Sequence, residues 1–346
     1  MTDILTTTGP TARIRLNRPK ALHALTQAMC KTITQALLDW RGDPDVRLIL
    51  LDHAGGRGFC AGGDIRMLAE SGAGDGQAAR DFFRAEYRMN HLLFTYAKPI
   101  VAVMDGVTMG GGVGIALPAS HRIATENTRL AMPETGIGLF PDVGGGWYLS
   151  RLPGHVGKFL AMTGARLDGA ECLELGLATH FISSEKLEAV KAELVETPSE
   201  VDAVLANHSS EPPPARILAN RAAIDRLFAA DTLEVIIADL EADGGEWAAK
   251  ELATLRIKSP QSCKVALRQL REGARMMDFA DEMRMEYGLA VHIVQRHDFL
   301  EGVRALILDK DDAPRWDPAT PEGVTDGRLD TIFAPVPAER AWTPIR

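Results

Sequence analysis

Two short apolar runs, each leading toward a glycine-rich turn, constrain the fold of this chain more than any other feature. The runs are residues 47–51 (RLILL) and 100–104 (IVAVM), and the turns lie at residues 62–63 and 110–112. Both runs have the length and composition of buried strands. Apolar residues at helical spacing also occur, for example over residues 29–40. Strands that alternate with helices indicate an α/β architecture with parallel strands.

The character of the chain changes after about residue 185. Before it, strand-like segments recur, including residues 12–16, where apolar positions alternate. After it, amphipathic helical segments follow one another, at residues 233–240, 247–255, 262–270, 279–294 and 299–306. The many prolines after Asp311 are typical of an extended surface strap. We predict an α/β core over residues 1–195 and a helical region with an extended tail over residues 196–346.

The charge balance limits the class of partner. The chain has 38 basic and 47 acidic residues and a net charge of −9, whereas a nucleic-acid-binding domain needs a basic surface. Its four cysteines stand far apart with no CxxC pair, which favours a reducing compartment. No apolar run reaches the roughly 18 residues of a membrane span, and the N-terminal residues do not resemble a targeting segment. We expect a cytoplasmic protein that binds neither nucleic acid nor a membrane.

The two glycine-rich turns have a chemical and a structural interpretation. Glycine lets the backbone approach a ligand closely, and the amides at the start of the following helix point outward, where the helix dipole favours negative charge. Two such amides that converge on one oxygen form an oxyanion hole, in which each donor contributes about 3–4 kcal/mol to transition-state stabilisation. The structural alternative is that the glycines only permit tight helix–strand packing. The presence of two matched units favours the chemical interpretation.

Residues 132–146 (MPETGIGLFPDVGGG) contain two carboxylates, Glu134 and Asp142, in an otherwise uncharged segment. Charged groups are costly to bury unless they have a partner or a function. An apolar setting raises the pKa of a carboxyl group from about 4.3 toward neutrality, which suits acid–base chemistry. The alternative is structural: Glu134 caps a helix and Asp142 forms an Asx turn.

The sequence contains no other clear catalytic motif. Cys60 lies beside a glycine turn, but no orienting histidine is identifiable, so packing as a small apolar residue is favoured. The nine histidines form no HExxH or zinc pattern, and there is no GxSxG elbow, Walker A run or complete GxGxxG. The pair His297-Asp298 fits either a proton relay or a contact that fixes the C-terminal region. No metal site is predicted.

Taken together, these segments resemble the crotonase (enoyl-CoA hydratase/isomerase) superfamily. Their order is NRP at residues 17–19, FCAGGDI at 59–65, MGGGVG at 109–114 and MPETGIGLFPDVGGG at 132–146. The resemblance implies a spiral of ββα turns with a C-terminal helical region. It also implies a site for acyl-CoA thioesters, with coenzyme A entering as part of the substrate and no separate cofactor. Members often form trimers or hexamers, which leaves a homo-oligomer open.

The resemblance assigns roles to particular residues. The oxyanion-hole amides would be those of Gly63 and Gly111. The substrate-binding positions would be Glu86, Gly63, Asp64, Ile65, Arg66, Gly111, Glu134 and Asp142. Arg66 is implied as a partner for a phosphate of coenzyme A, and Glu86 as a contact of the substrate, through its hydroxyl. The sequence by itself leaves Glu86 equally open as a solvated helix residue.

Two positions favour one reaction within the superfamily. Enoyl-CoA hydratases use two glutamates; here the second is present as Glu134, but Gly114 stands at the first position and cannot activate water. Asp142 stands where hydratases typically carry glycine. This pattern resembles the 3-hydroxyisobutyryl-CoA hydrolases of the superfamily, as do residues 297–305 and 309–311.

The predicted reaction is therefore hydrolysis of a short branched 3-hydroxyacyl-CoA, as in valine breakdown, with Glu134 and Asp142 as the catalytic residues. Glu134 either attacks the carbonyl or activates water as a general base. Asp142 orients the water or the substrate hydroxyl and handles a proton. One alternative is an enoyl-CoA hydratase or isomerase with Glu134 as its sole base. The other is an acyl-CoA-binding protein without catalysis.

Overall fold

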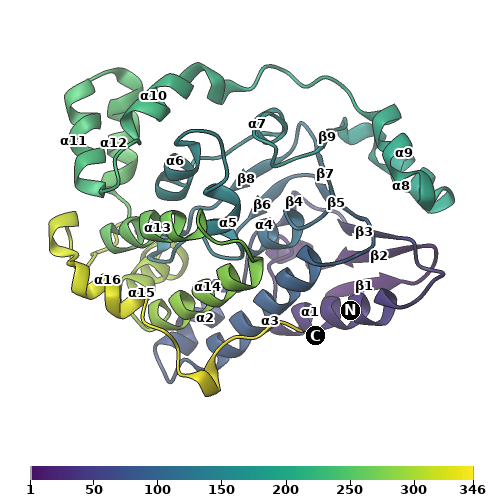
Figure 1. Ribbon diagram of the computed structural model, residues 1–346, viewed down its shortest axis with the longest axis horizontal. Helices are drawn as coiled ribbons and strands as arrows, with labels where there is room; N and C mark the ends of the chain where they lie inside the picture. The colour runs from purple at the N-terminus through teal and green to yellow at the C-terminus, as the bar shows by residue number, and fades with distance from the viewer. Residues whose placement is uncertain (1, 346) are drawn as a thin grey trace.

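The computed structural model describes residues 2–345, and two sheets of mostly parallel strands lie at its centre (Figure 1). The strands are β1 (Ile4–Thr7), β2 (Thr11–Leu16), β3 (Leu48–His53), β4 (Gly58–Cys60), β5 (Ile100–Met104), β6 (Val107–Met109), β7 (His121–Ala124), β8 (Arg129–Ala131) and β9 (His180–Phe181). The larger sheet has the order β1-β2-β3-β5-β7-β9 and the smaller has the order β4-β6-β8. Every neighbouring pair is parallel except β1 and β2.

Successive strands alternate between the two sheets. β3, β5 and β7 belong to the larger sheet, and each is followed by a strand of the smaller one, β4, β6 or β8. Helices follow β4 and β6, so the chain winds through repeated ββα turns. The predicted α/β class with parallel strands is confirmed, and so is the ββα spiral that the resemblance implies.

Both faces of the central strands β3 and β5 are buried, which explains their unbroken apolar runs. Leu48 and Leu50 of β3 pack with helices α8 (Leu187–Glu196) and α9 (Val201–His208) in one core. Ile49 and Leu51 face the other way, into the main core of the molecule. A parallel strand buried on both faces needs apolar residues at every position, not at alternate ones.

The helices of the first half connect the strands. They are α1 (Gln27–Arg41), α2 (Ile65–Gly72), α3 (Gln77–Phe94), α4 (Gly111–Ala116), α5 (Gly145–Leu149), α6 (Val156–Thr163) and α7 (Gly169–Glu174). Thr26 caps α1 by accepting a hydrogen bond from the amide of Met29 at 3.2 Å. Asp168 and Glu171 form the predicted capping box at the start of α7.

The second half is helical, as predicted. Its helices are α8 and α9, then α10 (Arg221–Leu227), α11 (Leu233–Asp243), α12 (Glu246–Arg256), α13 (Pro260–Gly273), α14 (Phe279–Ile293), α15 (His297–Val303) and α16 (Asp326–Ile332). In Figure 1, α10–α12 form an outer group at the upper left, while α13 and α14 lie beside the core. The predicted division at residue 195 falls near the end of α8, a helix that packs on the sheet.

The tail differs from the prediction of an extended surface strap. It contains α16, whose Ile332 is fully buried, and farther along it contains Trp342, which is also 0% exposed. Figure 1 shows the yellow C-terminal chain passing below α14 toward α3 and α1. The error arose because proline content indicates a break in regular structure and does not report which side chains pack between the prolines.

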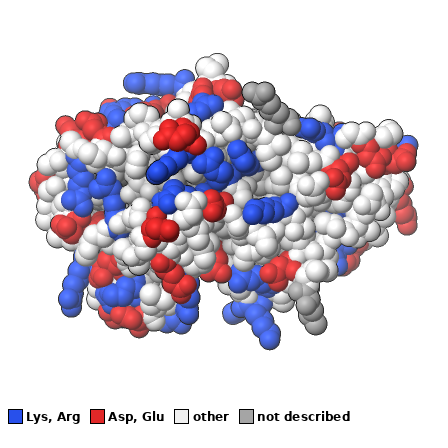
Figure 2. Space-filling model, turned by 90° about the horizontal axis from the view of Figure 1, so that it is seen from below, with Lys and Arg blue, Asp and Glu red and all other residues white. Residues whose placement is uncertain are grey.

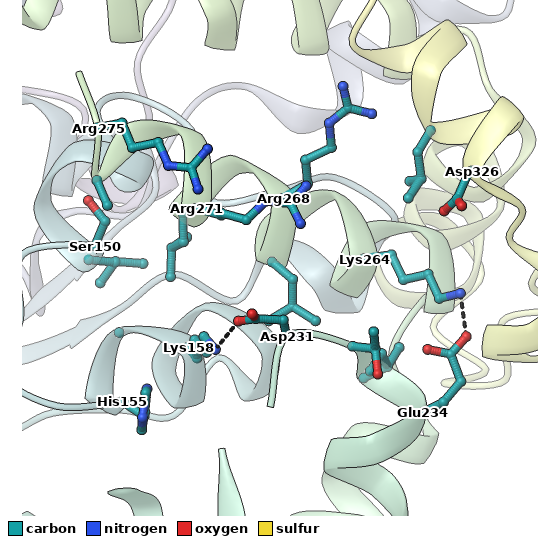
Figure 3. A pocket seen from close by; sticks show the side chains of 18 of the residues that line it. Ser150, His155, Lys158, Asp231, Glu234, Lys264, Arg268, Arg271, Arg275 and Asp326 are labelled. Atoms are coloured by element: carbon teal, nitrogen blue, oxygen red, sulfur yellow. Dashed lines mark hydrogen bonds and ion pairs between the residues drawn. The ribbon is translucent and has the colours of Figure 1, made fainter. Parts of the chain in front are cut away.

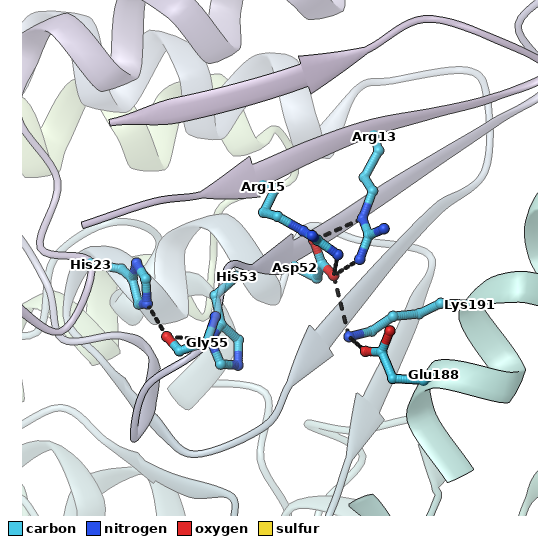
Figure 4. A network of polar contacts seen from close by, with 8 residues as sticks. All are labelled: Arg13, Arg15, His23, Asp52, His53, Gly55, Glu188 and Lys191. Carbon is cyan, nitrogen blue, oxygen red and sulfur yellow. Dashed lines mark hydrogen bonds and ion pairs between the residues drawn. The ribbon is translucent and has the colours of Figure 1, made fainter. Parts of the chain in front are cut away.

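A cluster of ion pairs joins α8 to the larger sheet (Figure 4). Asp52 of β3 is fully buried, and its carboxylate contacts Arg13, Arg15 at 3.3 Å and Lys191 of α8 at 3.2 Å. Lys191 also pairs with Glu188 at 2.8 Å. A buried carboxylate requires such partners, because removing a charge from water without them is costly. The cluster therefore fixes α8 against the face of the sheet.

On the face of the molecule shown in Figure 2, positive and negative side chains are interspersed. Both signs of charge are therefore present on this face, in a chain whose net charge is −9. Among residues 2–345, no helix combines the length and the apolar character needed to cross a membrane.

Candidate active site

A cavity of about 460 Å³ opens where the two glycine-rich turns meet the segment with the two carboxylates. Its walls come from both turns, from α3, from residues 133–142 and from the π-helical turn Arg304–Leu308. Six of the eight predicted site residues line it: Gly63, Ile65, Glu86, Gly111, Glu134 and Asp142. Segments that lie far apart in the sequence thus form one site.

The two turns lie against each other because they follow paired strands, β4 and β6. A methyl group added at Gly62 would lie 3.7 Å from the amide nitrogen of Gly111 and 3.5 Å from the carbonyl oxygen of Met109. Throughout residues 2–345, neither Gly63 nor Gly111 donates its amide N–H to a backbone hydrogen bond. Both amides are therefore available to a ligand in the cavity.

Glu86 projects from α3 against the second turn. Its side chain is 2% exposed, so the alternative of a solvated helix residue is wrong. A methyl group added at Gly111 would lie 2.5 Å from Glu86 Oε1, and only glycine leaves room for this carboxyl group. Burial, followed by the charges of Asp142 and Glu134, raises the pKa of Glu86 well above its usual range. Oε1 has no hydrogen-bond partner among the described residues.

Glu134 begins a short 3₁₀ helix, Glu134–Ile137, and lies against the same turn. A methyl group added at Gly110 would lie 3.0 Å from Glu134 Oε1, and Oε2 has no partner within residues 2–345. Burial and the neighbouring Asp142 raise the pKa of Glu134, while Lys258 acts in the opposite direction. The cap position of this helix is held by Pro133, and Glu134 is its first residue, so the interpretation of Glu134 as the helix cap is wrong.

Asp142 is held by Tyr87, the residue after Glu86 on α3. The Tyr87 hydroxyl donates to Asp142 Oδ2 at 2.7 Å. Burial raises the pKa of Asp142 to about 6, and the hydrogen bond from Tyr87 limits the rise by stabilising the charged form. The Asx-turn alternative is wrong, because the amide of Gly144 donates instead to Glu286, at 2.7 Å.

Gly114 has no space for a second catalytic acid. A methyl group added there would lie 2.5 Å from Cβ of Val143 and 2.9 Å from Nδ2 of Asn90. Asn90 in turn donates to the carbonyl oxygen of Gly114 at 2.9 Å. Any side chain at position 114 would therefore require Val143, and with it the Asp142 turn, to move.

Two predicted substrate-binding residues lie outside the lining of the cavity. Asp64 caps α2 by accepting a hydrogen bond from the amide of Met67 at 3.4 Å, and it pairs with Arg18 at 3.3 Å. Arg66 is exposed on α2. The structure therefore brings Gly63 and Ile65 of this segment into the cavity but not the two charged residues beside them.

Sequence reasoning missed Tyr87 and Lys258. A signal for Tyr87 exists, because Phe83, Tyr87 and Asn90 recur at helical spacing and place polar groups on the buried face of α3. No comparable signal exists for Lys258, which reaches the cavity from the turn after α12. Arg166 and Asp312 also line the cavity and bring two further charges to it.

A larger hollow of about 790 Å³ lies elsewhere, between α6, α11, α13 and α16 (Figure 3). Both of its lysines have acidic partners: Lys158 pairs with Asp231 at 3.0 Å, and Lys264 pairs with Glu234. None of the described residues that line it is a predicted site residue. The smaller cavity is therefore the candidate active site.

The other residues that the sequence suggested for a chemical role, His297, Asp298 and Cys60, lie in structural settings outside the cavity. His297 forms no hydrogen bond with a described residue of the cavity, and its Nε2 lies 2.8 Å from the carbonyl oxygen of Arg315. Asp298 accepts from Ser259 at 2.5 Å and from the amide of Asp317 at 2.8 Å, as the interpretation of a fixed C-terminal region predicts. Burial raises the pKa of the Cys60 thiol to about 12. Among residues 2–345, no group of three or more His, Cys, Asp or Glu side chains could hold a metal ion.

Comparison with known proteins identifies the family. The sequence pattern described as "Enoyl-CoA hydratase/isomerase" matches residues 11–333. The 3-hydroxyisobutyryl-CoA hydrolase, mitochondrial, of Danio rerio is 45% identical over 335 residues, which cover 94% of this chain and 87% of that protein. The protein of the same name from Homo sapiens is 43% identical, with coverage of 94% and 86%.

Two solved structures are similar over nearly their whole length. A carnitinyl-CoA dehydratase from Mycobacterium thermoresistibile superposes with a TM-score of 0.93 at 38% identity, covering 97% of each chain. An enoyl-CoA hydratase from Rhodobacter sphaeroides 2.4.1 superposes with a TM-score of 0.91 at 40% identity, covering 99% of this chain and 100% of that one. The chain belongs to the enoyl-CoA hydratase/isomerase family.

Proposed function

We propose that this enzyme hydrolyses the thioester of a short branched 3-hydroxyacyl-CoA, with 3-hydroxyisobutyryl-CoA as the first substrate to test. The observation that carries the proposal is the pair Glu134 and Asp142 at one cavity, together with the packing that excludes an acid at position 114. The relatives named 3-hydroxyisobutyryl-CoA hydrolase, which share 43–45% of their residues with this chain, support the same substrate.

The two unbonded amides supply the site for the thioester oxygen. As the carbonyl carbon is attacked, negative charge develops on its oxygen, and the N–H groups of Gly63 and Gly111 would stabilise that charge. Donors that are already in place in a site without water need no reorganisation during the reaction. This role explains why both turns keep their amides out of the backbone hydrogen-bond network.

Glu134 is the group that attacks or activates the attacking water. Its raised pKa makes it a stronger base than a surface carboxylate once its proton is lost. Direct attack would form an anhydride with release of the coenzyme A thiolate, and water would then open the anhydride. Single turnover in ¹⁸O water separates the routes: label in the Glu134 carboxylate supports the anhydride, and label only in the product acid contradicts it.

Asp142 orients the water or the substrate hydroxyl and handles a proton. With a pKa of about 6 it is mostly ionised at neutral pH, and Tyr87 fixes one of its two oxygens. The free oxygen can then accept a hydrogen bond from the substrate side. Glu86, with its unpaired Oε1 beside the second turn, would contact the hydroxyl of the acyl group.

A thiol-release assay over short 3-hydroxyacyl-CoA thioesters tests the proposal. Glu134→Gln is expected to lower kcat by about 10²–10⁴-fold, the usual contribution of a positioned base, and Asp142→Asn by a similar order. Glu339→Gln, a change to an exposed glutamate of the tail, serves as the matched control. Thiol release that continues undiminished in Glu134→Gln would contradict the mechanism.

A second function is favoured by the names of the two solved structures, a dehydratase and a hydratase. In that case Glu134 would act as the sole base on an enoyl-CoA. Incubation with crotonyl-CoA distinguishes the two: loss of enoyl absorbance without free thiol supports the lyase. Binding of coenzyme A thioesters with no turnover of any kind would instead support the non-catalytic alternative.

We propose no metal or further cofactor, since coenzyme A enters with the substrate. A role in valine breakdown follows only if 3-hydroxyisobutyryl-CoA proves to be the preferred substrate. The cytoplasmic location stays a prediction, and the relatives above carry the word mitochondrial in their names. A homo-oligomeric state also stays a prediction, which sedimentation of the purified protein would test.

A further inference from the structure

The turn that carries Asp142 is held in a conformation it would not adopt by itself. Val143 has a φ of +53° and Gly144 a φ of +92°. A β-branched residue in this left-handed region is a steric outlier, and it persists only where the surrounding structure enforces it. Some neighbouring group must therefore restrain the turn, and the direction of the Asp142 carboxylate depends on that restraint.

Glu286 supplies the restraint from α14. Its Oε2 accepts a hydrogen bond from the amide of Gly144 at 2.7 Å, and its Oε1 accepts one from the amide of Gly146 at 3.1 Å. Both oxygens of one carboxylate are thus used to fix two amides of the turn that follows Asp142. The side chain is 0% exposed, so water cannot substitute for it.

Gln269 of α13 completes the arrangement. Its Nε2 donates to the carbonyl oxygen of Pro141 at 2.7 Å, on the other side of Asp142, and to Glu286 Oε1 at 2.9 Å. One amide group therefore connects the residue before Asp142 to the carboxylate that holds the residues after it. Gln269 is also fully buried.

Glu282 lies one helical turn before Glu286 and is also fully buried. Neither of its oxygens accepts a hydrogen bond from the described residues, whereas Glu286 accepts three. Burial raises the pKa of both groups, that of Glu282 to about 7, and each carboxyl group affects the other. The three donors favour the charged form of Glu286, whereas no donor among the described residues does so for Glu282.

We infer that Glu286 is a positioning residue for the reaction: through Gly144 and Gly146, and with Gln269, it fixes the strained turn that aims Asp142 into the cavity. The inference rests on the proposed function, because the role of Asp142 in hydrolysis is part of that proposal. Glu286 is not among the described residues that line the cavity, so it acts through the turn.

A double-mutant cycle with Asp142 tests the inference in the full-length enzyme. Glu286→Gln keeps the size of the side chain but leaves an NH₂ group facing an amide N–H, so one of the two bonds to the turn is lost. We expect kcat for thiol release to fall by about tenfold or more, with KM changed by less than about threefold. In an Asp142→Asn background the same change is expected to lower kcat by less than about twofold, because residues that act as a unit are not additive.

Glu282→Gln is the matched control, at the same depth on the same helix. This change keeps the size of the side chain and leaves the hydrogen bonds from Gly144, Gly146 and Gln269 to Glu286 in place, so kcat is expected to stay within about threefold of the wild type. If Glu286→Gln retains wild-type kcat, or if its full effect persists in the Asp142→Asn background, the inference is overturned.

Hydrogen exchange separates failure of the inference from failure of the proposed function. The amide hydrogens of residues 142–146 are expected to exchange faster in Glu286→Gln than in the wild type. In Glu282→Gln their exchange rate is expected to be unchanged. If the wild type releases no thiol from any 3-hydroxyacyl-CoA, the proposed function fails. The exchange measurement then still decides whether Glu286 holds the turn, and unchanged exchange would contradict it.

Discussion

Three carboxyl groups with raised pKa values share one cavity, and their protonation decides what the site can do. Glu86, Glu134 and Asp142 are each at most 5% exposed. Burial dominates the shift of every one, and their mutual repulsion adds to the shifts of Glu86 and Glu134. Asp142 alone has a side-chain donor, Tyr87, which favours its charged form. The site thus combines an ionised acid at neutral pH with groups that hold their protons longer.

The hydrogen bond from Tyr87 should be visible in the pH dependence of the reaction. Both Glu134 and Asp142 must be ionised to act, so kcat/KM is expected to rise with pH, and Asp142 contributes to that rise through its pKa of about 6. Tyr87→Phe removes the donor that stabilises the charged form, so the rise should move to higher pH. We expect a loss of about 3–10-fold at pH 6 and a smaller loss at pH 8. A pH–rate profile checks this, and an unmoved profile would argue against Asp142.

Ionisation of Glu134 should lower the free energy of unfolding as pH rises. Its folded-state pKa is raised, so the folded chain binds this proton more tightly than the unfolded chain does. Stability from this group is present below the unfolded pKa of about 4.3 and is lost as pH rises through the folded value. Glu134→Gln is therefore expected to raise Tm at pH 8 by about 2 °C or more, and by less at pH 5. Calorimetry at the two pH values checks this; an equal change at both would contradict it.

At the scale of elements, α3 is the helix that organises the site. One buried face carries Glu86 against the second turn, Tyr87 against Asp142 and Asn90 against the backbone of α4. The helix α4 packs in return against Val143, which follows Asp142. Glycine at position 114 therefore has two consequences. It leaves room for the Asp142 turn to pack, and it means that no catalytic acid stands at this position.

Gly114→Ala is expected to destabilise the protein by about 1–3 kcal/mol, because the added methyl group would overlap Val143 and Asn90. Gly327→Ala is the matched control, since Gly327 lies in α16 with nothing within 4 Å of an added methyl group. That change is expected to be neutral or to stabilise by up to about 1 kcal/mol. Urea unfolding measures both, and equal effects would contradict the packing argument.

Local patterns in the sequence predicted the elements but not the contacts between them. The strands at residues 48–53 and 100–104 and the helices after residue 185 follow from periodicity and run length. The hydrogen bonds of Tyr87 and Glu286 do not, because each partner lies 55 residues or more away. The carboxylates of residues 132–146 were identified by chemistry and family resemblance. The group that restrains their turn comes from α14 and appears only once the chain is folded.

At the scale of the whole molecule, the tail closes the structure over α3. Trp342 is fully buried with its ring 5.7 Å from that of His91. Arg88 of α3 donates to the carbonyl oxygen of Thr343 at 2.9 Å, and Arg84 donates to that of Ala341 at 3.1 Å. The helix that positions Glu86 and Tyr87 is thus held on its outer side by the end of the described chain.

Trp342→Ala is expected to cost about 3–5 kcal/mol of stability, the usual effect of truncating a buried tryptophan. Because the cavity forms against α3, kcat should fall as well. Trp342→Phe is the control, which keeps an aromatic ring beside His91 and should lose much less. Unfolding in urea together with a thiol-release assay checks both, and wild-type stability in Trp342→Ala would show that the tail does not support α3.

The contacts of the tail also bear on when the enzyme becomes active during its synthesis. Arg88 and Thr343 are 255 residues apart in sequence, so α3 emerges from the ribosome long before the residues that cover it. Domains fold from the N-terminal side as the chain is made, yet this helix keeps an uncovered side until residue 343 has been translated and released. A nascent chain that already carries both glycine turns, Glu134 and Asp142 therefore still lacks the final restraint on its active-site helix.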